Sequence, residues 1–235
     1  LHRVDRRQRQ MCIRDRESLP GIENKCMKKK IEIASWPRRS HYEYFQTFEC
    51  PMFSITSPVR VDALYRYAKQ EGISFFALCL FVLLKAVNKI PQLRQRVEEG
   101  EVWEYESVDA LVPVLAADGE FTQILVEYRA ELADFLEHAV PLIQAAKQAP
   151  ARANPCHRTD IAVFSCLPWI PFTQVASAYR VFRGQYLPLI HWGKMEADVS
   201  GRLMMPVAIQ ANHVLVDGVH VGNFYKNIDC FCCGF

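Results

Sequence analysis

An apolar run over residues 75–87 limits the possible folds more than any other feature of this sequence. The run is about 13 residues long and gives way to the mixed segment Lys-Ala-Val-Asn-Lys. A membrane-spanning helix needs roughly 20 apolar residues, so the run is too short to cross a bilayer. Ser74 can cap a helix here and Pro91 can end it. We therefore predict a helix buried inside a substantial core.

Helix-like and strand-like patterns alternate around this central helix. Strands are expected at residues 52–55 and in the runs EVWEYE, ALVPVLA, DIAVFSC and GRLMMPVAIQA, where Pro206 favours an edge or a bulge. Further helices are expected just after Pro37, over residues 62–70, over residues 124–146 as one long helix or a helix pair, and from Val219 onward. This pattern predicts a two-layer α/β sandwich in which helices cover one face of a mixed sheet.

Composition narrows the class of protein. With 235 residues, half of them hydrophobic, the chain has the material for one large domain. Its 28 basic and 26 acidic residues nearly cancel, which argues against nucleic acid or a membrane surface as a partner. The nine cysteines are odd in number and irregularly spaced, so reduced thiols in the cytoplasm are expected rather than a disulfide framework.

The two ends differ in composition from the rest of the chain. Residues 1–26 are charge-dense and lack apolar periodicity, and MCIRDR within them resembles a translated sequencing adapter, so a disordered or artefactual leader is expected. Residues 27–229 form the expected domain. Residues 230–235 are expected to be a truncated, non-native end. A metal site at CFCC is a weaker alternative because zinc-ligand spacing is lacking, and no metal is predicted.

The segment IQANHVLVDGVHVGNFY is the leading candidate for chemistry. His213 follows a strand-like run, and its apolar neighbours predict a dry site in which desolvation keeps the imidazole neutral, as a general base requires. Asp217 is placed to cap the following helix. These residues alone leave a second interpretation open, in which His213 is a packed histidine and Asp217 only a cap.

Four separated segments resemble chloramphenicol acetyltransferases, in the order that this family shows. They are SWPRRSHYEYFQ, FSCLPWIPFT, LPLIHWGK and NHVLVDGVHVG, and the similarity runs over about residues 31–227. The resemblance implies that His213 is the base that deprotonates an acceptor hydroxyl and that Ser165 stabilises the oxyanion. It also implies that Asp217 supports the site through an ion pair with Arg38. Simpler alternatives are a strand-end serine for Ser165 and a solvated charge for Arg38.

The same resemblance implies residues for binding. Phe45, Phe121 and His191 match acceptor-binding positions, and Lys194 matches a position near the phosphates of coenzyme A, with an ordinary surface lysine as the alternative. His191 stands where the family has a threonine that positions a water. Asn212 stands where the antibiotic-inactivating members have a second histidine ahead of the base, and we expect little effect on the chemistry.

The wall of the acceptor pocket departs most from the family. Val175, Ser177 and Tyr179 occupy positions where family members place a large aromatic residue and then apolar residues. A smaller and more polar wall buries less of an aromatic ring and therefore binds it less well. The best acceptor is then expected to differ from chloramphenicol, although chloramphenicol remains the leading named candidate.

The resemblance further implies a homotrimer whose active sites lie between subunits and an acetyl-CoA-dependent O-acetylation of a small hydroxyl compound. Acetyl-CoA is then a co-substrate and no metal takes part. The competing hypothesis is a trimeric ligand-binding homologue of the same fold without efficient catalysis, which His191 and Asn212 motivate.

Overall fold

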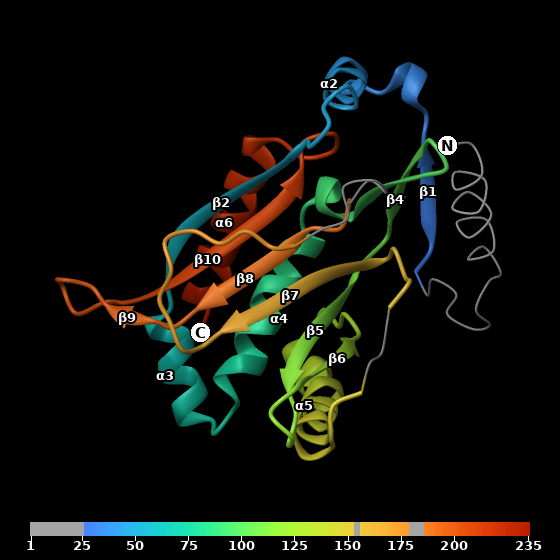
Figure 1. Cartoon of the computed structure of the whole chain (residues 1–235). Helices are drawn as coiled ribbons and strands as arrows, with labels where there is room; N and C mark the ends of the chain where they lie inside the picture. The colour runs from blue at the N-terminus through green and yellow to red at the C-terminus, as the bar shows by residue number, and fades with distance from the viewer. Residues whose placement is uncertain (1–25, 153–155, 179–185) are drawn as a thin grey trace, which may run out of the picture.

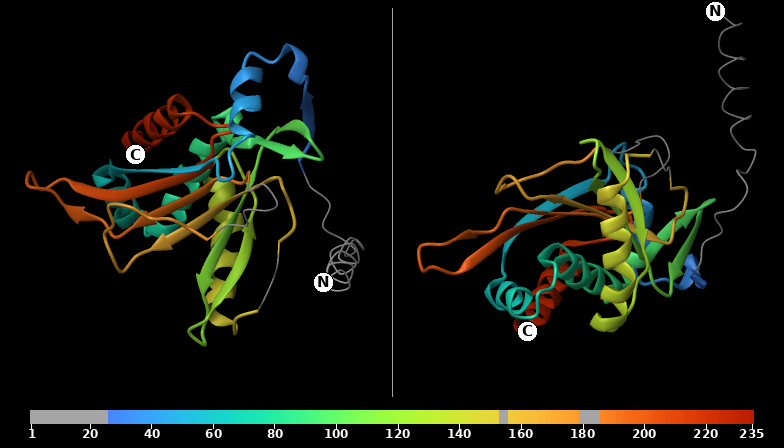
Figure 2. Two further views of the ribbon diagram at one scale, coloured as in Figure 1. Left: turned by 45° about the horizontal axis from the view of Figure 1, so that its top comes forward. Right: turned by 90° about the horizontal axis from the view of Figure 1, so that it is seen from below.

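The computed structural model describes residues 26–152, 156–178 and 186–235, and its main feature is a mixed sheet with helices packed on one face (Figures 1 and 2). The strand order is β2-β10-β8-β7-β5-β6, and β9 pairs with β10 beside this path. Strands β5, β7 and β8 run parallel, and the other pairs are antiparallel. The strands are β2 Met52–Arg60, β5 Asp109–Leu115, β6 Phe121–Val126, β7 Ile161–Leu167, β8 Leu189–Gly193, β9 Glu196–Ala197 and β10 Leu203–Asn212.

A second, smaller sheet has the order β1-β4-β3, formed by Lys28–Ile31, Glu101–Tyr105 and Gln95–Glu98. A buried arginine joins it to the main sheet. Arg96 of β3 donates to the carbonyl oxygens of Thr159 and Ile161 at 2.8 and 2.6 Å. Because a buried charge is tolerated only when its donors are satisfied, these contacts fix where the two sheets meet. Within the main sheet, Arg158 pairs with Asp109 and Asp160, each at 2.7 Å, and ties the start of β5 to the chain that enters β7.

The apolar run predicted as a buried helix forms α4, Phe75–Asn88, at the centre of the helical layer. Ser74 caps it by accepting a hydrogen bond from Ala77 N–H, as predicted. Helices α3 Asp62–Gln70, α5 Leu132–Gln148 and α6 Gly218–Cys233 pack around it, on the same face of the sheet (Figure 2). The short α2, Arg39–Phe45, lies apart from this layer, and single 3-10 turns occur at Ile33–Ser35 and Pro91–Arg94. The predicted two-layer α/β class is confirmed.

The prediction of helix over residues 124–146 is wrong in its first part. Residues 121–126 form β6, which pairs with β5 in a hairpin, and α5 begins only at Leu132. Ile124 and Leu125 fit one face of a helix, but in a strand they alternate between the two faces of the sheet. The overlooked signal is Asp118-Gly119, where Gly119 adopts φ +85° in the turn of the hairpin.

Pro206 was expected at an edge or a bulge, and the edge alternative is wrong, because β10 lies inside the sheet between β2 and β8. On one side Pro206 is level with Pro58 of β2, a pair in which neither residue has an N–H to donate. On the other side β8 pairs only from Val207 onward and β9 only up to Met204. The proline therefore lies at a gap in the ladder, where a missing donor costs nothing.

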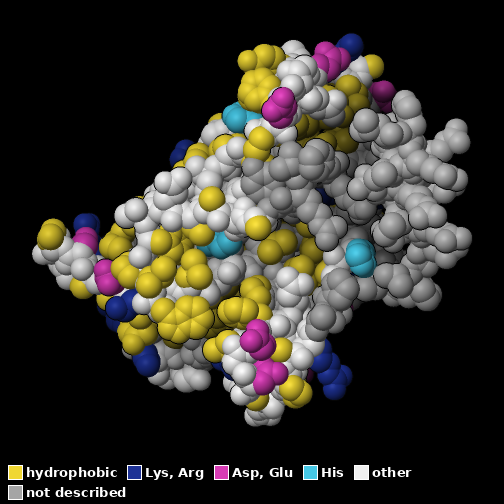
Figure 3. Space-filling model, viewed as in Figure 1, with side chains coloured by type: hydrophobic (Ala, Val, Ile, Leu, Met, Phe, Trp, Pro, Cys, Tyr) yellow, Lys and Arg dark blue, Asp and Glu magenta, His cyan; other side chains and the backbone are white. Residues whose placement is uncertain are grey.

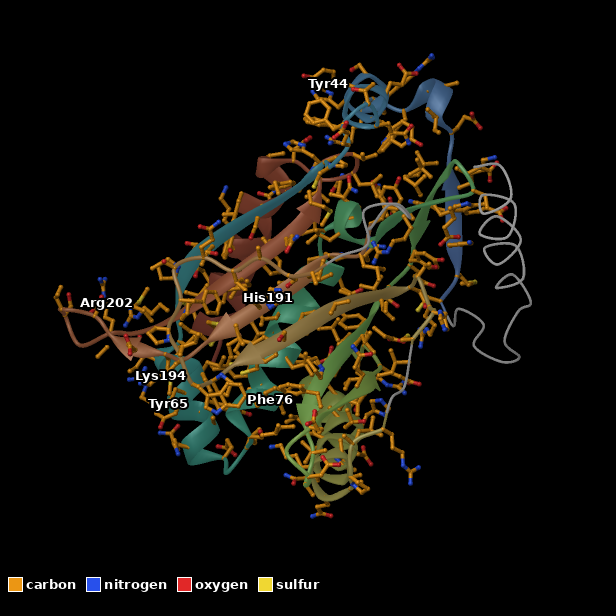
Figure 4. The ribbon with its side chains drawn as sticks, viewed as in Figure 1. Tyr44, Tyr65, Phe76, His191, Lys194 and Arg202 are labelled. Carbon is orange, nitrogen blue, oxygen red and sulfur yellow. The ribbon has the colours of Figure 1, made fainter. Side chains whose placement is uncertain are left out.

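Among the described residues, no helix packs on the opposite face of the main sheet. Residues of β10 alternate between Val207 and Ile209, which lie in the core beneath the helices, and Ala208 and Gln210, which face the other way. Ser165 of β7 and His191 of β8 belong to this uncovered face, since Phe164 and Ile190 beside them lie in the core. The face shows hydrophobic side chains around a central histidine, which Figure 4 labels as His191 (Figures 3 and 4).

Candidate functional site

His213 lies in the turn between the end of β10 and the start of α6. Its backbone N–H donates to Pro51 O at 2.7 Å, which ties the turn to the chain that enters β2. The side-chain oxygen of Asn212 accepts from Val214 N–H at 2.9 Å, and the carbonyl of Asn212 accepts from Leu215 and Val216. Asn212, which is almost fully buried, thus organises the turn that presents the histidine.

Arg38, just before α2, holds the same turn from the other side. Its guanidinium donates to Asp217 Oδ2, to His213 O at 2.6 Å and to Val214 O at 3.3 Å. Only 10% of the Arg38 side chain is exposed, so the alternative of a solvated arginine is wrong. The predicted ion pair with Asp217 is present, and the two backbone contacts extend it to the residue that bears the imidazole. A planar guanidinium suits this task because several donors point in fixed directions.

Asp217 is the N-cap residue of α6, as predicted, and a capping box joins it to His220, whose Nδ1 accepts from Asp217 N–H at 2.8 Å. Burial alone would raise the pKa of the Asp217 carboxyl, but the hydrogen bond and charge of Arg38 outweigh burial and lower it. Asp217 Oδ1 lies 3.2 Å from His213 Nδ1 without hydrogen-bond geometry. The carboxylate therefore stays ionised next to the His213 imidazole. It also lies at the N-terminus of α6, where the helix dipole favours a negative charge.

Two aromatic rings hold the imidazole of His213. Phe45 stacks on it with ring centroids 3.9 Å apart and planes 13° from parallel, and Phe53 lies 4.7 Å away at 41°. Phe45 is among the residues expected at the site, whereas Phe53 is not, because an aromatic residue within a strand pattern gives no sign of which side chain it contacts. A third of the His213 side chain, 32%, remains exposed. Within one chain the site is thus less dry than predicted.

Ser165 and His191 lie side by side on the uncovered face, at one level of the β7–β8 ladder. His191 is also level with Ala208 of β10, five residues before His213. At about 3.3 Å per residue and about 4.8 Å per strand, Ser165 and His213 of one chain are roughly 15–20 Å apart. The structure brings together Arg38, Phe45, His213 and Asp217, and separates them from Ser165.

Above His191 the chain after β7 crosses the uncovered face, and we call residues 173–178 the strap. Three hydrogen bonds hold it down. Ser54 Oγ donates to Val175 O at 3.2 Å, Ser177 N–H donates to Gln210 Oε1 at 3.0 Å, and Ser177 Oγ lies 2.5 Å from His191 Nε2. Burial lowers the pKa of His191, so this imidazole is neutral near pH 7. Tyr179 lies outside the described residues.

Lys194 and Phe121 line an apolar pocket of about 520 Å³ at the other end of the molecule, with Trp169, Trp192 and Phe76 in its walls (Figure 4). Phe121 lies on β6, at the far edge of the sheet from Phe45 and His213. The ammonium group of Lys194 is half-exposed and 3.6 Å from Glu196. Gly193 makes the neighbouring wall possible, because a β-carbon there would lie 2.8 Å from the Phe172 ring and 2.9 Å from Ile170 O.

Cys26, the last residue of the expected leader, donates its N–H to Asp160 at 3.1 Å, and residues 1–25 lie outside the described part. In α6, Cys232 packs into the core while Cys230 and Cys233 are exposed. Within the described ranges, no cluster of three or more His, Cys, Asp or Glu side chains is arranged to hold a metal ion. In the same ranges, every helix is too short or too polar to span a bilayer.

Comparisons with known proteins decide the family. The family model described as "Chloramphenicol acetyltransferase" matches residues 27–229. The chain belongs to the chloramphenicol acetyltransferase family. Chloramphenicol acetyltransferase 3 of Escherichia coli is similar to it at 24% identity over 208 residues, which cover 86% of this chain and 96% of the relative. The corresponding enzyme of Proteus mirabilis is 25% identical, with 86% and 93% covered.

Solved structures agree with this family. A chloramphenicol acetyltransferase chain is similar at a TM-score of 0.80 and 30% identity, and the match covers 88% of this chain and 100% of that one. The dihydrolipoamide acetyltransferase of Azotobacter vinelandii is similar at a TM-score of 0.56 and 15% identity, with 90% and 91% covered, which shows a common fold. This chloramphenicol acetyltransferase family member is therefore an acyltransferase enzyme.

Proposed function

We propose that the protein is an acetyl-CoA-dependent O-acetyltransferase for a small hydroxyl acceptor, with chloramphenicol as the leading named candidate and His213 as the general base. The observation that carries this proposal is the fixed position of His213. Its turn is held by Arg38, Asn212 and Pro51, and its ring is stacked by Phe45. A base must be positioned within hydrogen-bond reach of the proton that it removes, and such a base contributes about 10²–10⁴-fold to the rate.

The reaction then proceeds in one transfer. His213 takes the proton of the acceptor hydroxyl while the oxygen attacks the thioester carbonyl of acetyl-CoA. The Ser165 hydroxyl donates a hydrogen bond to the negative oxygen of the tetrahedral intermediate. Collapse of the intermediate breaks the C–S bond, the acetyl ester leaves, and the thiolate of coenzyme A takes the proton back from the imidazolium.

The apolar pocket beside Lys194 is the proposed site for acetyl-CoA. Its walls suit the uncharged pantetheine arm, because apolar side chains such as Trp169 and Phe76 gain from covering methylene groups. The half-exposed cation of Lys194 suits a phosphate group at the rim. Phe121 lines this pocket, at the far edge of the sheet from Phe45 and His213 of the same chain. Phe121 can therefore contribute to acceptor binding only if the acceptor site is formed by more than one subunit.

We further propose a homotrimer in which His213 of one chain meets Ser165 of the next. The separation of roughly 15–20 Å within one chain supports this arrangement, since His213 must reach the attacking hydroxyl while Ser165 reaches the oxygen of the carbonyl under attack. The uncovered sheet face that carries Ser165 also supports a trimer. If a neighbouring subunit packs its His213 turn against this face, water is excluded from the partly exposed His213 imidazole.

The first experiment measures release of coenzyme A with a thiol reagent, using acetyl-CoA and either chloramphenicol or a panel of small alcohols. We expect His213→Ala to reduce transfer by at least about 10²-fold. His157→Ala, a change at an exposed histidine in the chain before β7, serves as the matched control and should keep the wild-type rate. Thioester hydrolysis without any acetylated product would contradict the proposed activity, and tight ligand binding without turnover would favour the non-catalytic alternative.

The second experiment tests the shared site. Chains carrying His213→Ala and chains carrying Ser165→Ala are each expected to be nearly inactive. When they are unfolded together and reassembled at equal ratio, about a quarter of the sites should combine an intact His213 with an intact Ser165, so activity should reappear. A mixture that stays as inactive as its two components would show that both residues act within one chain.

A further inference from the structure

The contact between Ser177 and His191 on the uncovered face has no role in the chemistry proposed above. Ser177 Oγ lies 2.5 Å from His191 Nε2, although these residues come from the strap and from β8. The His191 side chain is 7% exposed, whereas Ser177 is half-buried and remains reachable. A buried imidazole whose nitrogen meets a half-buried hydroxyl is thus a polar feature of this face, with hydrophobic side chains close by (Figure 3).

The pair is held in place before any ligand binds. Ser177 N–H donates to Gln210 Oε1 at 3.0 Å, and the Gln210 side chain is itself almost fully buried between the strap and the sheet. Two residues earlier, Val175 O accepts from Ser54 at 3.2 Å. Groups fixed in this way lose little conformational entropy when a ligand binds, so their hydrogen bonds contribute more to recognition.

The Ser177 hydroxyl can pair with a ligand in either arrangement of the protons. If it donates to Nε2 of His191, its oxygen keeps a lone pair that accepts a hydrogen bond. If Nε2–H donates to the serine oxygen, the hydroxyl proton is free to be donated. An alcohol matches both arrangements, because a hydroxyl group both donates and accepts.

The pair also lies at a fixed spacing from the proposed oxyanion residue. His191 is level with Ser165 on the adjacent strand, so the two side chains are about 5 Å apart. An acceptor whose reacting oxygen lies near Ser165 reaches Ser177 and His191 with a group three or four carbons away.

We propose that Ser177 and His191 select acceptors that carry a second hydroxyl group three or four carbons from the acetylated one, over acceptors of equal size that carry a methyl group or an apolar ring there. This inference rests on the proposed acetyltransferase activity and names the class of its substrate, an aliphatic diol or polyol. A site with prepared hydrogen-bonding groups discriminates against a ligand lacking the partner group, because its own polar atoms are then buried unpaired.

The test compares 1,4-butanediol with 1-pentanol, which differ only by a hydroxyl in place of a methyl group. The readout is the ratio of their kcat/KM values for coenzyme A release, measured on the full chain. The wild-type ratio, corrected for the two equivalent hydroxyls of the diol, should be at least about 10. Ser177→Ala removes the hydroxyl and keeps the backbone bond to Gln210, so the ratio should fall toward 1. Ser54→Ala is the matched control, because it removes an anchor of the strap and leaves the pair intact.

Every result of this comparison either supports the inference about Ser177 and His191 or overturns it. A ratio of at least 10 that Ser177→Ala abolishes and Ser54→Ala preserves supports the inference. A wild-type ratio near 1 with clear turnover of both alcohols, or a ratio that Ser177→Ala leaves unchanged, overturns the inference but not the acetyltransferase activity. Equal losses in the two variants would also overturn it, because loosening of the strap rather than loss of the hydroxyl would then explain the ratio. Absence of turnover with every acceptor, chloramphenicol included, would overturn the proposed function and this inference together.

Discussion

The turn that carries His213 and the uncovered face that carries Ser165 differ in how completely one chain builds them. Around His213, side chains from α2, β2, β10 and α6 meet, and Arg38 alone contacts three residues of the turn region. On the uncovered face, Ser165 is half-buried, and the strap above His191 is held by single hydrogen bonds. The proposed base is thus positioned by many contacts within its own chain, whereas the strap that lies over His191 is held by few and tolerates substitution more easily.

Loss of Arg38 should have the largest effect, because it tests whether the turn depends on this one side chain. Arg38→Met removes the ion pair and both carbonyl contacts, leaving Asp217 partly buried without its partner. We expect the free energy of unfolding to fall by about 3 kcal/mol, measured by urea denaturation. Arg39→Met is the matched control, since its exposed pair with Glu43 is worth less than about 1 kcal/mol. Equal effects of the two changes would contradict the special role of Arg38.

Loss of the Ser165 hydroxyl should lower the reaction rate and leave the free energy of unfolding unchanged, whereas loss of Arg38 should lower the free energy of unfolding. Ser165→Ala should lower kcat by about 10²–10³-fold, because a single oxyanion donor is removed. The midpoint of urea unfolding should stay at the wild-type value, since the hydroxyl lies on the uncovered face. Ser165→Thr keeps a hydroxyl and should recover part of the rate. A clear loss of stability in Ser165→Ala would assign the serine to the fold.

Asn212 tests whether the turn tolerates the loss of one internal acceptor. Asn212→Ala leaves Val214 N–H without its side-chain partner in a buried position and should cost about 1–3 kcal/mol. Asn212→Ser keeps an oxygen that can accept from Val214 N–H and adds no buried charge, so it should cost less. Thermal unfolding of the three proteins at one pH provides the comparison. If alanine and serine behave alike, the hydrogen bond to Val214 is not what holds the turn.

Acid should weaken the His213 turn gradually, and this is the smallest effect expected. The pKa of Asp217 is lower in the folded chain than its usual value, so its contribution to stability is complete above about pH 4 and is lost as pH falls through the folded pKa. Urea unfolding of the wild type and Asp217→Asn from pH 2 to 6 checks this. The difference in unfolding free energy between them should grow from pH 2 to about pH 4 and then stay constant.

The sequence predicted the elements whose local signals agree with their packing. The α4 run, its Ser74 cap and the Asp217 cap of α6 were correct because residue type and position suffice to define them. The region of β6 was predicted as helix because the apolar residues Ile124 and Leu125 fit the spacing of a helix as well as that of a strand. Only the pairing with β5 decides between the two. Pro206 was expected at an edge or a bulge because the sequence does not reveal that Pro58 lies opposite it.

For the candidate site, the sequence predicted the partners that lie within one turn or that the family resemblance pairs. The ion pair of Arg38 with Asp217 is of this kind. The guanidinium contacts to the carbonyls of His213 and Val214 could not be predicted, because they depend on the path of the backbone. The bond between Ser177 and His191 was missed for a similar reason, since 13 residues separate them from each other along the chain and the strap brings them together only in three dimensions.

Gly193 limits how the binding surfaces of this enzyme can diversify. Any side chain at this position would push residues 168–172 away from β8, because Phe172 and Ile170 already occupy the space. That segment leads directly into the strap, and the next residue, Lys194, lines the apolar pocket. A larger residue would thus shift the walls for donor and acceptor at the same moment. New acceptor preferences are reached more safely by exchanging strap side chains while this backbone crossing stays as it is.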